Sequence, residues 1–559
     1  MDPRIADLAQ RFWDGLMRIS PQTATVYGDH RFDHMLGDRS EAGLADAMSF
    51  LEGVATDAEA IPDDGLTKSD RITRAMLISE SRGFAIETDP IALQIGIDPL
   101  TGVVSALISV AAQTQIDDPD DTPALLERYS QVGRYLEESL DWHRRGLSVG
   151  RVAPGTNIGR VLEQIDAYLA SPVEQDPFVN IGLPSWDGEA QWRKDMTDLV
   201  ESHVRPAFAK YRHGLADELL EHGRSDDKPG LLWVEGGAEY YEKLIERYTT
   251  LHESADSIHA YGLFEIEDHL LEELRRYGES ALGTPDTRQL FDRLRTDESL
   301  RFADKESLIA FNEAVIARAE AAIPDWFGRL PQAACQMAEI PAALAPNMPP
   351  AYYYPPPADG SRPGTYFINT ADAPSMQTFD MEAVAFHEAV PGHHLQCAIN
   401  AEAGDLPMFR RYNLIYAYAE GWGLYAERLA DEMGLYTSDL ERIGMASADA
   451  WRCARLVVDT GIHAKGWSRQ QAIDFIMNHT PIKESTVKQE VDRYIGYPGQ
   501  ALAYKIGQRE IFRLRKQAED RLGDRFDIRT FHDALLTSGA MPLPMLDTLI
   551  TEWIEATAA

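Results

Sequence analysis

The chain has 559 residues, and 44% of them are hydrophobic, which is enough for a large buried core. Its 53 basic and 90 acidic side chains give a formal net charge of −37. This charge argues against nucleic-acid binding and against an anionic membrane as partner, because both need a basic protein surface.

Three cysteines offer no disulfide framework. The first residues lack the pattern of a signal peptide, and no apolar run reaches the ~18 residues of a membrane span. We therefore expect a cytoplasmic location.

The length alone would suggest several domains, but no linker, low-complexity run or repeat divides the sequence. We expect one large domain over residues 1–559. Residues 1–340 would form its N-terminal helical part, and residues 341–559 would carry the functional site. The expected fold class is mainly α, with many helices arranged in two lobes around a deep cleft.

Apolar residues at helical spacing dominate the N-terminal part. The predicted helices cover residues 5–17, 125–136, 192–219, 240–251, 258–277 and 308–323. Clusters of turn-forming residues at 117–121, 224–230 and 283–285 separate them.

Residues 341–377 differ, because nine prolines exclude a continuous helix. Within them, residues 364–370 form a short β-type run. We predict an edge strand beside the active-site helix, which would bind a peptide backbone by strand addition. Tyr366 and Asn369 would be its substrate-binding residues. Further helices are predicted over residues 380–390, 414–433 and 448–462, and Tyr504 is expected on a helix.

The segment 387–396 (HEAVPGHHLQ) holds three histidines and one glutamate, and Glu420 follows 26 residues after His394. Two histidines and a distal carboxylate are the ligands of a catalytic zinc site, which keeps its fourth position for water. The free Glu388 beside His387 has the position of a general base. These residues predict one zinc ion.

The spacing departs from the ordinary H-E-x-x-H motif, because Pro391 stands where the second histidine should be. His393 and His394 would lie about 9–10.5 Å along a straight helix from His387. Two ligands of one zinc lie only about 3–3.5 Å apart. The helix must therefore break near Pro391 and Gly392, a glycine that tolerates positive φ. Both His393 and His394 remain candidates for the second ligand.

Other residues are assigned more general roles. Glu420 is the candidate third ligand, with Glu427 as its alternative. Tyr504 is the first candidate donor to a tetrahedral intermediate, followed by His463. Three cations could bind a substrate carboxylate, namely Arg455, Arg362 and Lys505.

At these residues the chain resembles a large bacterial metallopeptidase-like family long catalogued as a domain of unknown function. Its signature H-E-x-x-P-G-H-H-x-Q matches residues 387–396, and the resemblance extends to residues 355–356, 359–364, 366–370, 420–422, 455–463 and 497–507. The resemblance implies a zincin-like fold, similar to deep-cleft zinc carboxypeptidases and oligopeptidases.

The expected function is a zinc metallopeptidase of the carboxypeptidase or oligopeptidase type that hydrolyses short peptides. Two alternatives remain open. One is a zinc-dependent amide or ester hydrolase with non-peptide substrates, and the other is a non-catalytic metal-binding or scaffold protein.

Overall fold

The computed structural model describes residues 1–340, 349–356, 362–404, 406–412 and 415–559. Three parts of the sequence predictions lie outside these residues: the prolines at 341–348 and 357, the segment 359–361 of the family resemblance, and the predicted helix start at Leu414. Among the described residues, helices predominate and the only sheet has three strands. The mainly α fold class is therefore confirmed.

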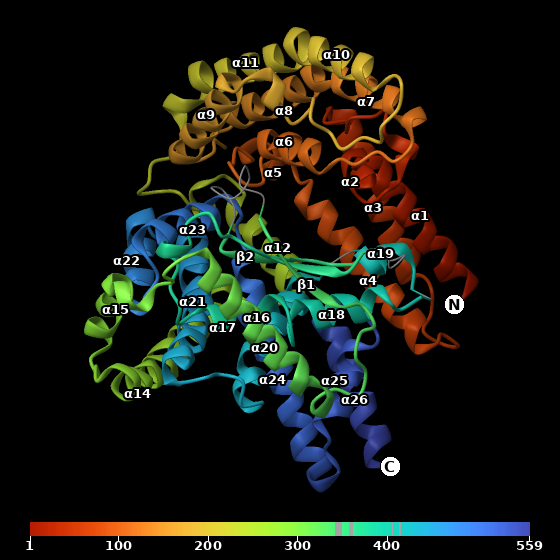
Figure 1. The fold of residues 1–559 in the computed structure, drawn as a ribbon. Helices are drawn as coiled ribbons and strands as arrows, with labels where there is room; N and C mark the ends of the chain where they lie inside the picture. The colour runs from red at the N-terminus through yellow and green to blue at the C-terminus, as the bar shows by residue number, and fades with distance from the viewer. Residues whose placement is uncertain (341–348, 357–361, 405, 413–414) are drawn as a thin grey trace.

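The helices of the N-terminal part are α1 (Pro3–Ile19), α2 (Pro21–Val26), α3 (Glu41–Glu59), α4 (Lys68–Glu87), α5 (Pro90–Ile95), α6 (Val103–Gln113), α7 (Thr122–Ser130), α8 (Val132–Ser148), α9 (Gly155–Ala170), α10 (Glu189–Leu199), α11 (Arg205–Gly214), α12 (Gly237–Thr249), α13 (Ala255–Phe264), α14 (Leu271–Leu282), α15 (Thr287–Thr296) and α16 (Lys305–Ala322). Figure 1 shows helices α6 to α11 arching above the rest of the molecule.

The remaining helices are α17 (Met381–Glu388), α18 (His393–Ala401), α19 (Met408–Tyr412), α20 (Tyr416–Glu432), α21 (Asp439–Ala464), α22 (Arg469–His479), α23 (Glu484–Gly496), α24 (Ala503–Leu522), α25 (Ile528–Leu536) and α26 (Leu543–Ala558). Helix α21 is longer than predicted at both ends, and the helix predicted over residues 125–136 is divided between α7 and α8.

Two of the predicted helices contain π-helical turns. The run 192–219 includes such turns at Val200–Val204 and Leu215–Leu219, and the run 258–277 includes one at Glu265–Leu270. Pro206 follows the first of these turns. A wider turn accommodates a proline because it relaxes the helix ladder that the ring interrupts.

The sheet has the order β1-β3-β2, with strands β1 (Cys335–Glu339), β2 (Ala351–Tyr354) and β3 (Gly364–Ile368). Strand β3 is parallel to β1 and antiparallel to β2, so it lies in the centre of the sheet. The prediction of an edge strand at residues 364–370 is therefore wrong in its position, because both backbone edges of β3 are already paired. The edge strand that contacts α17 is β2.

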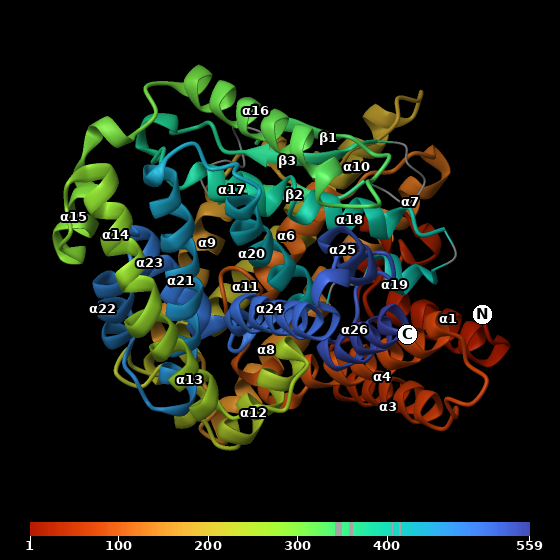
Figure 2. The same cartoon turned by 90° about the horizontal axis from the view of Figure 1, so that it is seen from below.

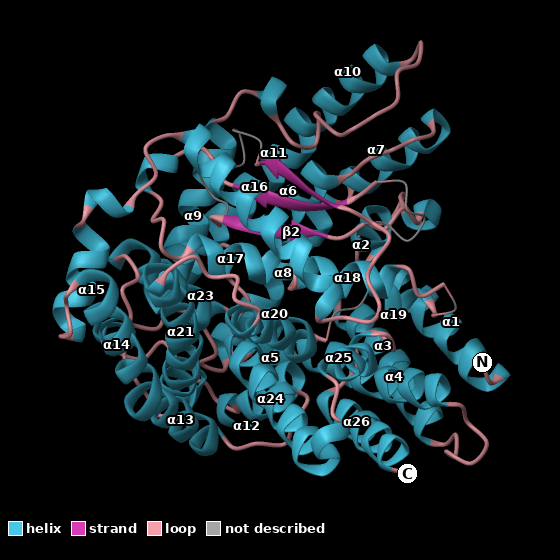
Figure 3. Ribbon diagram, turned by 60° about the horizontal axis from the view of Figure 1, so that its bottom comes forward, coloured by secondary structure: helices cyan, strands magenta, loops and turns pink. Residues whose placement is uncertain are grey.

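One face of the sheet packs on helices. Ile316 of α16 and Ala389 after α17 share a hydrophobic cluster with Tyr366 and Ala351. On the opposite face the rings of Tyr352 and Phe367 stack at 5.0 Å. Figures 2 and 3 show α16, α17 and α18 grouped beside the strands.

A hydrophobic core joins helices far apart in the sequence. It contains Ile5 of α1, Phe386 of α17, Trp422 of α20 and Ile554 of α26, so residues from both sides of position 340 share it. A second core lies between Leu36 and Leu219. The arrangement of two lobes around a deep cleft remains a prediction.

Candidate active site

The break between α17 and α18 brings His393, the first residue of α18, back to His387. The Val390–Pro391 peptide bond is cis, and Gly392 has φ −79°, so the break does not use the positive φ that glycine tolerates. Glycine is needed there for another reason, since a Cβ atom would lie 1.9 Å from the carbonyl oxygen of His387. The indole of Trp422 donates hydrogen bonds to the carbonyl oxygens of Pro391 and Gly392, at 3.0 and 3.2 Å. Helix α20 thus fixes the break.

Three of the predicted ligands meet where α17, α18 and α20 converge. Ligand atoms of His387, His393 and Glu420 all lie within 4.8 Å of one another. One oxygen of Glu420 lies 3.4 Å from Nε2 of His387 and 3.5 Å from Nε2 of His393. The two imidazole rings are nearly perpendicular, with centroids 4.7 Å apart.

His394 is directed away from this cluster. Its Nδ1 lies 3.0 Å from the Tyr353 hydroxyl of β2, and its Nε2 lies 3.1 Å from the carbonyl oxygen of Ala333. Both ring nitrogens therefore have partners. Of the two candidate second ligands, the structure brings His393 to the cluster and uses His394 to anchor α18 to the sheet.

Glu427 contacts the far side of His387. Its Oε1 lies 2.7 Å from Nδ1 of that ring, and Glu427 follows Glu420 by about two turns on nearly the same face of α20. A carboxylate on the second ring nitrogen fixes the orientation and tautomer of a ligating histidine. The expected alternative ligand is thus placed as an orienting residue.

Glycine at position 423 allows His387 to lie directly against α20. A Cβ atom there would stand 2.7 Å from both Cε1 and Nε2 of the ring. Helices α20 and α24 are equally close, because a Cβ atom at Gly421 would lie 2.5 Å from Cα of Gly507. Small residues around Glu420 therefore allow the close helix contacts on which the cluster depends.

The three groups of the cluster carry coupled charges. Burial alone would raise the pKa of Glu420, but hydrogen bonds from His387 and His393 hold it well below its ordinary range. Burial disfavours the charged ring of His387, yet its contacts with Glu420 and Glu427 raise its pKa to about 9. These groups attract cations, protons included.

Glu388 is half-buried beside the cluster. Burial raises its pKa, while the imidazoles of His393 and His387 oppose this shift. A carboxylate with a raised pKa can accept and return a proton near neutral pH.

Tyr504 reaches the site from α24. Its ring lies nearly parallel to that of His387, with centroids 6.5 Å apart. Burial raises the pKa of its hydroxyl, and the charge of Glu420 adds to this effect. The phenol therefore stays protonated and able to donate a hydrogen bond.

His463, predicted as a catalytic donor, lies inside the last turn of α21 and is buried. Its Nδ1 accepts a hydrogen bond from the Leu231 amide at 3.2 Å, and its Nε2 lies 2.9 Å from the carbonyl oxygen of Tyr494. Both ring nitrogens of His463 therefore contact backbone groups, so His463 is not placed to donate to a tetrahedral intermediate as predicted.

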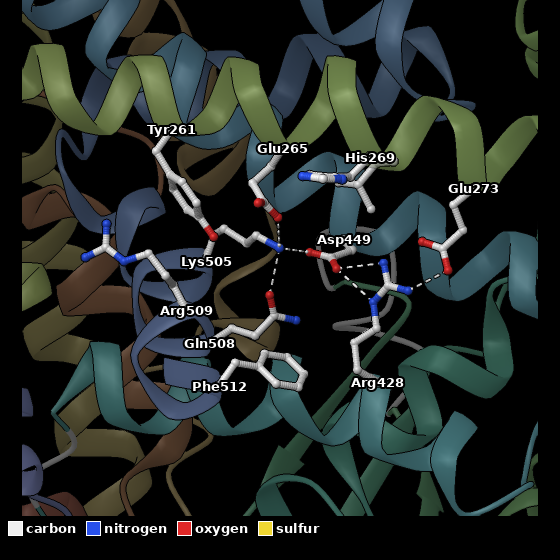
Figure 4. Close-up of a pocket in the computed structure, with 11 residues that line it drawn as sticks. Tyr261, Glu265, His269, Glu273, Arg428, Asp449, Lys505, Gln508, Arg509 and Phe512 are labelled. Atoms are coloured by element: carbon white, nitrogen blue, oxygen red, sulfur yellow. Dashed lines mark hydrogen bonds and ion pairs between the residues drawn. The ribbon is translucent and has the colours of Figure 1, made fainter. Parts of the chain in front are cut away.

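Lys505 belongs to a separate ionic cluster on another face of α24, around a pocket of about 350 Å³ (Figure 4). Its ammonium donates to Asp449 at 2.7 Å and to Gln508 at 2.8 Å. Asp449 also bonds Arg428. Lys505 is therefore an ion-pair residue, which corrects its assignment as a ligand for a substrate carboxylate.

The residues predicted around the strand have other contacts. Tyr366 is fully buried, and its hydroxyl donates to Asn312 of α16 at 3.0 Å, so a substrate cannot reach it. The amide of Asn369 donates to the carbonyl oxygen of Pro350 at 2.9 Å. The guanidinium of Arg362 lies 4.4 Å from the centroid of the Tyr354 ring. None of the three belongs to the cluster.

Arg455 is brought near the site together with an arginine that the sequence analysis missed. The Arg455 guanidinium lies 4.6 Å from the centroid of the Tyr504 ring, and that of Arg452 lies 6.0 Å from it. Nη2 of Arg452 is 3.5 Å from Oε1 of Glu427. The signal available in the sequence was the spacing of three residues between the two arginines.

Comparisons with known proteins identify relatives without assigning a function. A family model described as "Bacterial protein of unknown function (DUF885)" matches residues 21–550. No curated protein matches the sequence. A solved structure, the "putative lipoprotein from Colwellia psychrerythraea", is 25% identical, has a TM-score of 0.91 and covers 100% of both chains. A "putative lipoprotein of unknown function from Shewanella oneidensis" is 19% identical, with a TM-score of 0.77 over 98% of this chain and 99% of its own.

The description of both neighbours as lipoproteins contradicts the cytoplasmic location expected from the sequence. Among the described residues, no helix has both the length and the apolar character needed to cross a bilayer.

Proposed function

The chain belongs to the DUF885 family of bacterial proteins of unknown function, and we propose from the site itself that it is a zinc-dependent metallopeptidase acting on short peptides. The observation that carries this proposal is the convergence of His387, His393 and Glu420, with Glu388 beside them. The metallopeptidase-like signature over residues 387–396 points to the same chemistry.

The three donors suit zinc. Two imidazole nitrogens lie 3.4 and 3.5 Å from the same carboxylate oxygen, close to the separation of ligands around one tetrahedral zinc. Structural zinc sites usually have four protein ligands, often cysteines, whereas three donors leave a position for water. Bound zinc would act as a Lewis acid and lower the pKa of its water to roughly 7.

The roles of the surrounding residues follow from their positions. Glu388 accepts the proton of the attacking water and delivers it to the nitrogen of the leaving amine. The Tyr504 hydroxyl donates a hydrogen bond to the oxyanion, a contact typically worth about 3–4 kcal/mol. Glu427 holds His387 in one orientation through its Nδ1.

The edge strand β2 is the candidate for binding the peptide backbone. It occupies the position beside α17 that was expected for residues 364–370. Its Tyr353 hydroxyl contacts His394, which is adjacent to His393. A peptide added along this strand would pair with its free backbone groups.

The description of the Colwellia protein supports a location outside the cytoplasm. Peptides of the cell envelope or of the medium would then be the substrates. Fractionation of cells that express the natural gene, with detection by antibody, tests this location.

A diverse peptide mixture, analysed by mass spectrometry with and without a chelator, tests the proposed activity. We expect chelator-sensitive cleavage by the wild type. The Glu388→Gln variant should keep its metal but lose a factor of about 10²–10⁴ in rate, because its amide cannot accept the proton. Hydrolysis of small esters without any cleavage of peptides would instead favour the amide or ester hydrolase.

A further inference from the structure

Two arginines on one side of α21 carry buried nitrogen atoms without a hydrogen-bond acceptor. Arg455 donates from Nε to the Tyr494 hydroxyl and from Nη2 to Glu490, at 2.9 and 3.2 Å. Its Nη1 and the Nε of Arg452 have no partner among the described residues. Their side chains are only 6% and 13% exposed. Buried cationic donors are costly when unpaired, so an acceptor from outside the chain is expected.

Both arginines adjoin the ligand cluster. Arg452 lies 3.5 Å from the oxygen of Glu427 that contacts His387. Both guanidiniums contact the ring of Tyr504. This ring also lies beside the ring of His387. One aromatic ring therefore separates these free donors from the place where a scissile bond would be cut. The centroid of this ring lies 4.6 Å from the Arg455 guanidinium and 6.5 Å from the centroid of the His387 ring, so a C-terminal carboxylate bound by the arginines would lie near the cluster.

The local charge favours an anion at this place. Arg455 and Arg493 both pair with the carboxylate of Glu490. Arg452 pairs with Glu427, whose carboxylate also contacts His387. Guanidinium groups match the planar, two-oxygen geometry of a carboxylate.

We propose, on the basis of the peptidase function above, that Arg452 and Arg455 bind the free C-terminal carboxylate of the substrate. The enzyme is then a carboxypeptidase that releases residues from the C-terminal end. Arg452 supplies Nε and Arg455 supplies Nη1, two buried donors that have no partner among the described residues.

Matched peptides that end in a free acid or in an amide test this proposal. With zinc-loaded protein we expect kcat/KM to be at least ten-fold higher for the acid, and the products to lack C-terminal residues. Replacement of either arginine by methionine should lower this acid-over-amide ratio by about 10–100-fold, the usual effect of losing one charge-assisted hydrogen bond. Arg442→Met, on the same helix α21, is the matched control and should leave the ratio unchanged, because the Arg442 donors already bind Asp431 and Asp439.

Binding to chelator-treated protein gives a readout that needs no metal and no turnover. The probe is an N-acetylated dipeptide, as acid or as amide, measured by calorimetry. We expect the acid to bind at least ten-fold more tightly, and this preference to be lost in Arg452→Met. Arg455→Lys serves as the second variant if Arg455→Met does not fold.

The outcomes separate the two proposals. If zinc-loaded protein hydrolyses acids and amides equally well, the carboxylate subsite is refuted and the peptidase stands. If it hydrolyses neither, the peptidase proposal fails, and with it the reason for the subsite.

Discussion

Two neighbouring histidines have opposite environments in this fold. His393 faces His387 and Glu420, whereas His394 bonds a tyrosine of the sheet and a backbone carbonyl. Chemical type alone could not separate them, because both residues are imidazoles at the same end of the motif. The direction of each side chain depends on the turn geometry at Gly392, which spacing arguments do not determine.

This difference gives a prediction about metal content. His393→Ala removes one of three donors, so zinc affinity should fall by more than the roughly 10–100-fold that the loss of an outer contact costs. His394→Gln is the matched control and should bind zinc like the wild type. Metal analysis after dialysis against competing chelator measures both. Equal loss of zinc in the two variants would show that the assignment of His393 is wrong.

At the residue scale, the sequence identified the residues whose chemistry is distinctive. His387, Glu388, Glu420 and Tyr504 were all predicted, and the structure groups them. Residues whose role depends on their contacts were harder to recognise, because the sequence does not show which partners they have. Arg452 was missed for this reason, and His463 was misassigned, since a histidine in a helix with two backbone partners looks identical in sequence to a catalytic one.

At the scale of elements, helices α17 and α20 approach closely because Gly423 has no side chain. Gly423→Ala would place a methyl group 2.7 Å from the His387 ring. We expect at least a ten-fold loss in zinc affinity, and a loss of about 1–3 kcal/mol in the free energy of unfolding because of overpacking. Metal titration and chemical denaturation measure the two effects.

Gly159→Ala in α9 is the matched control for that substitution. A Cβ atom at Gly159 meets no atom within 4 Å. Alanine should therefore leave zinc binding unchanged and stabilise the helix by up to about 1 kcal/mol. If the two variants bind zinc equally well, the contact at position 423 does not position His387.

The strand prediction shows what local sequence can and cannot determine. The β-branched and aromatic run at residues 364–370 predicts a strand, and β3 forms there. Strand β3 pairs with β1, which ends about 25 residues before it, and with β2, which precedes residues 357–361 in the sequence. Which strand occupies the edge is decided by tertiary packing on α16 and α17, and no short-range pattern encodes it.

The ionic cluster in Figure 4 links the helices that hold the site. Arg428 follows Glu427 on α20, Asp449 precedes Arg452 by three residues on α21, and Lys505 follows Tyr504 on α24. Each of these three residues is therefore close in sequence to a residue of the site. The cluster fixes the relative position of three helices without contacting the candidate ligands.

At the scale of the whole molecule, several buried histidines make stability depend on pH. Burial lowers the pKa of His463 to about 3, although its contact with the Tyr494 carbonyl opposes the shift. Burial also lowers the pKa of His143 to about 4 and of His532 to about 3. These rings stay neutral in the folded protein, while in the unfolded chain they take up protons below about pH 6.5.

The sign of the effect follows from this difference. The stabilising contribution is complete above pH 6.5 and is lost as the pH falls toward 3, by about 1.4 kcal/mol per pH unit for each histidine. His463→Gln should reduce the slope of unfolding free energy between pH 4.5 and 6.5 by nearly that amount. The exposed His252 provides the control, and His252→Gln should leave the slope unchanged. Urea denaturation at a series of pH values gives both slopes, and equal slopes in the two variants would contradict the prediction.

The overall class of the fold was predictable because helical periodicity persists through most of the chain. Helices α1, α12 and α16 lie within a few residues of their predicted limits. The π turns and the division between α7 and α8 were not predictable, since they depend on contacts with distant helices. The location was predicted wrongly, because sparse cysteines and the lack of a long apolar run do not identify a cellular compartment.

The short edge of strand β2 also affects aggregation between copies of this molecule. An unpaired edge can recruit a strand from a second chain and so begin aggregation. Here the edge is only four residues long, with Pro349 and Pro350 before it and Pro355 and Pro356 after it. Proline has no amide hydrogen to offer, so a growing intermolecular sheet would end after a few pairings. The shortness of β2 thus limits self-association through this edge at high concentration.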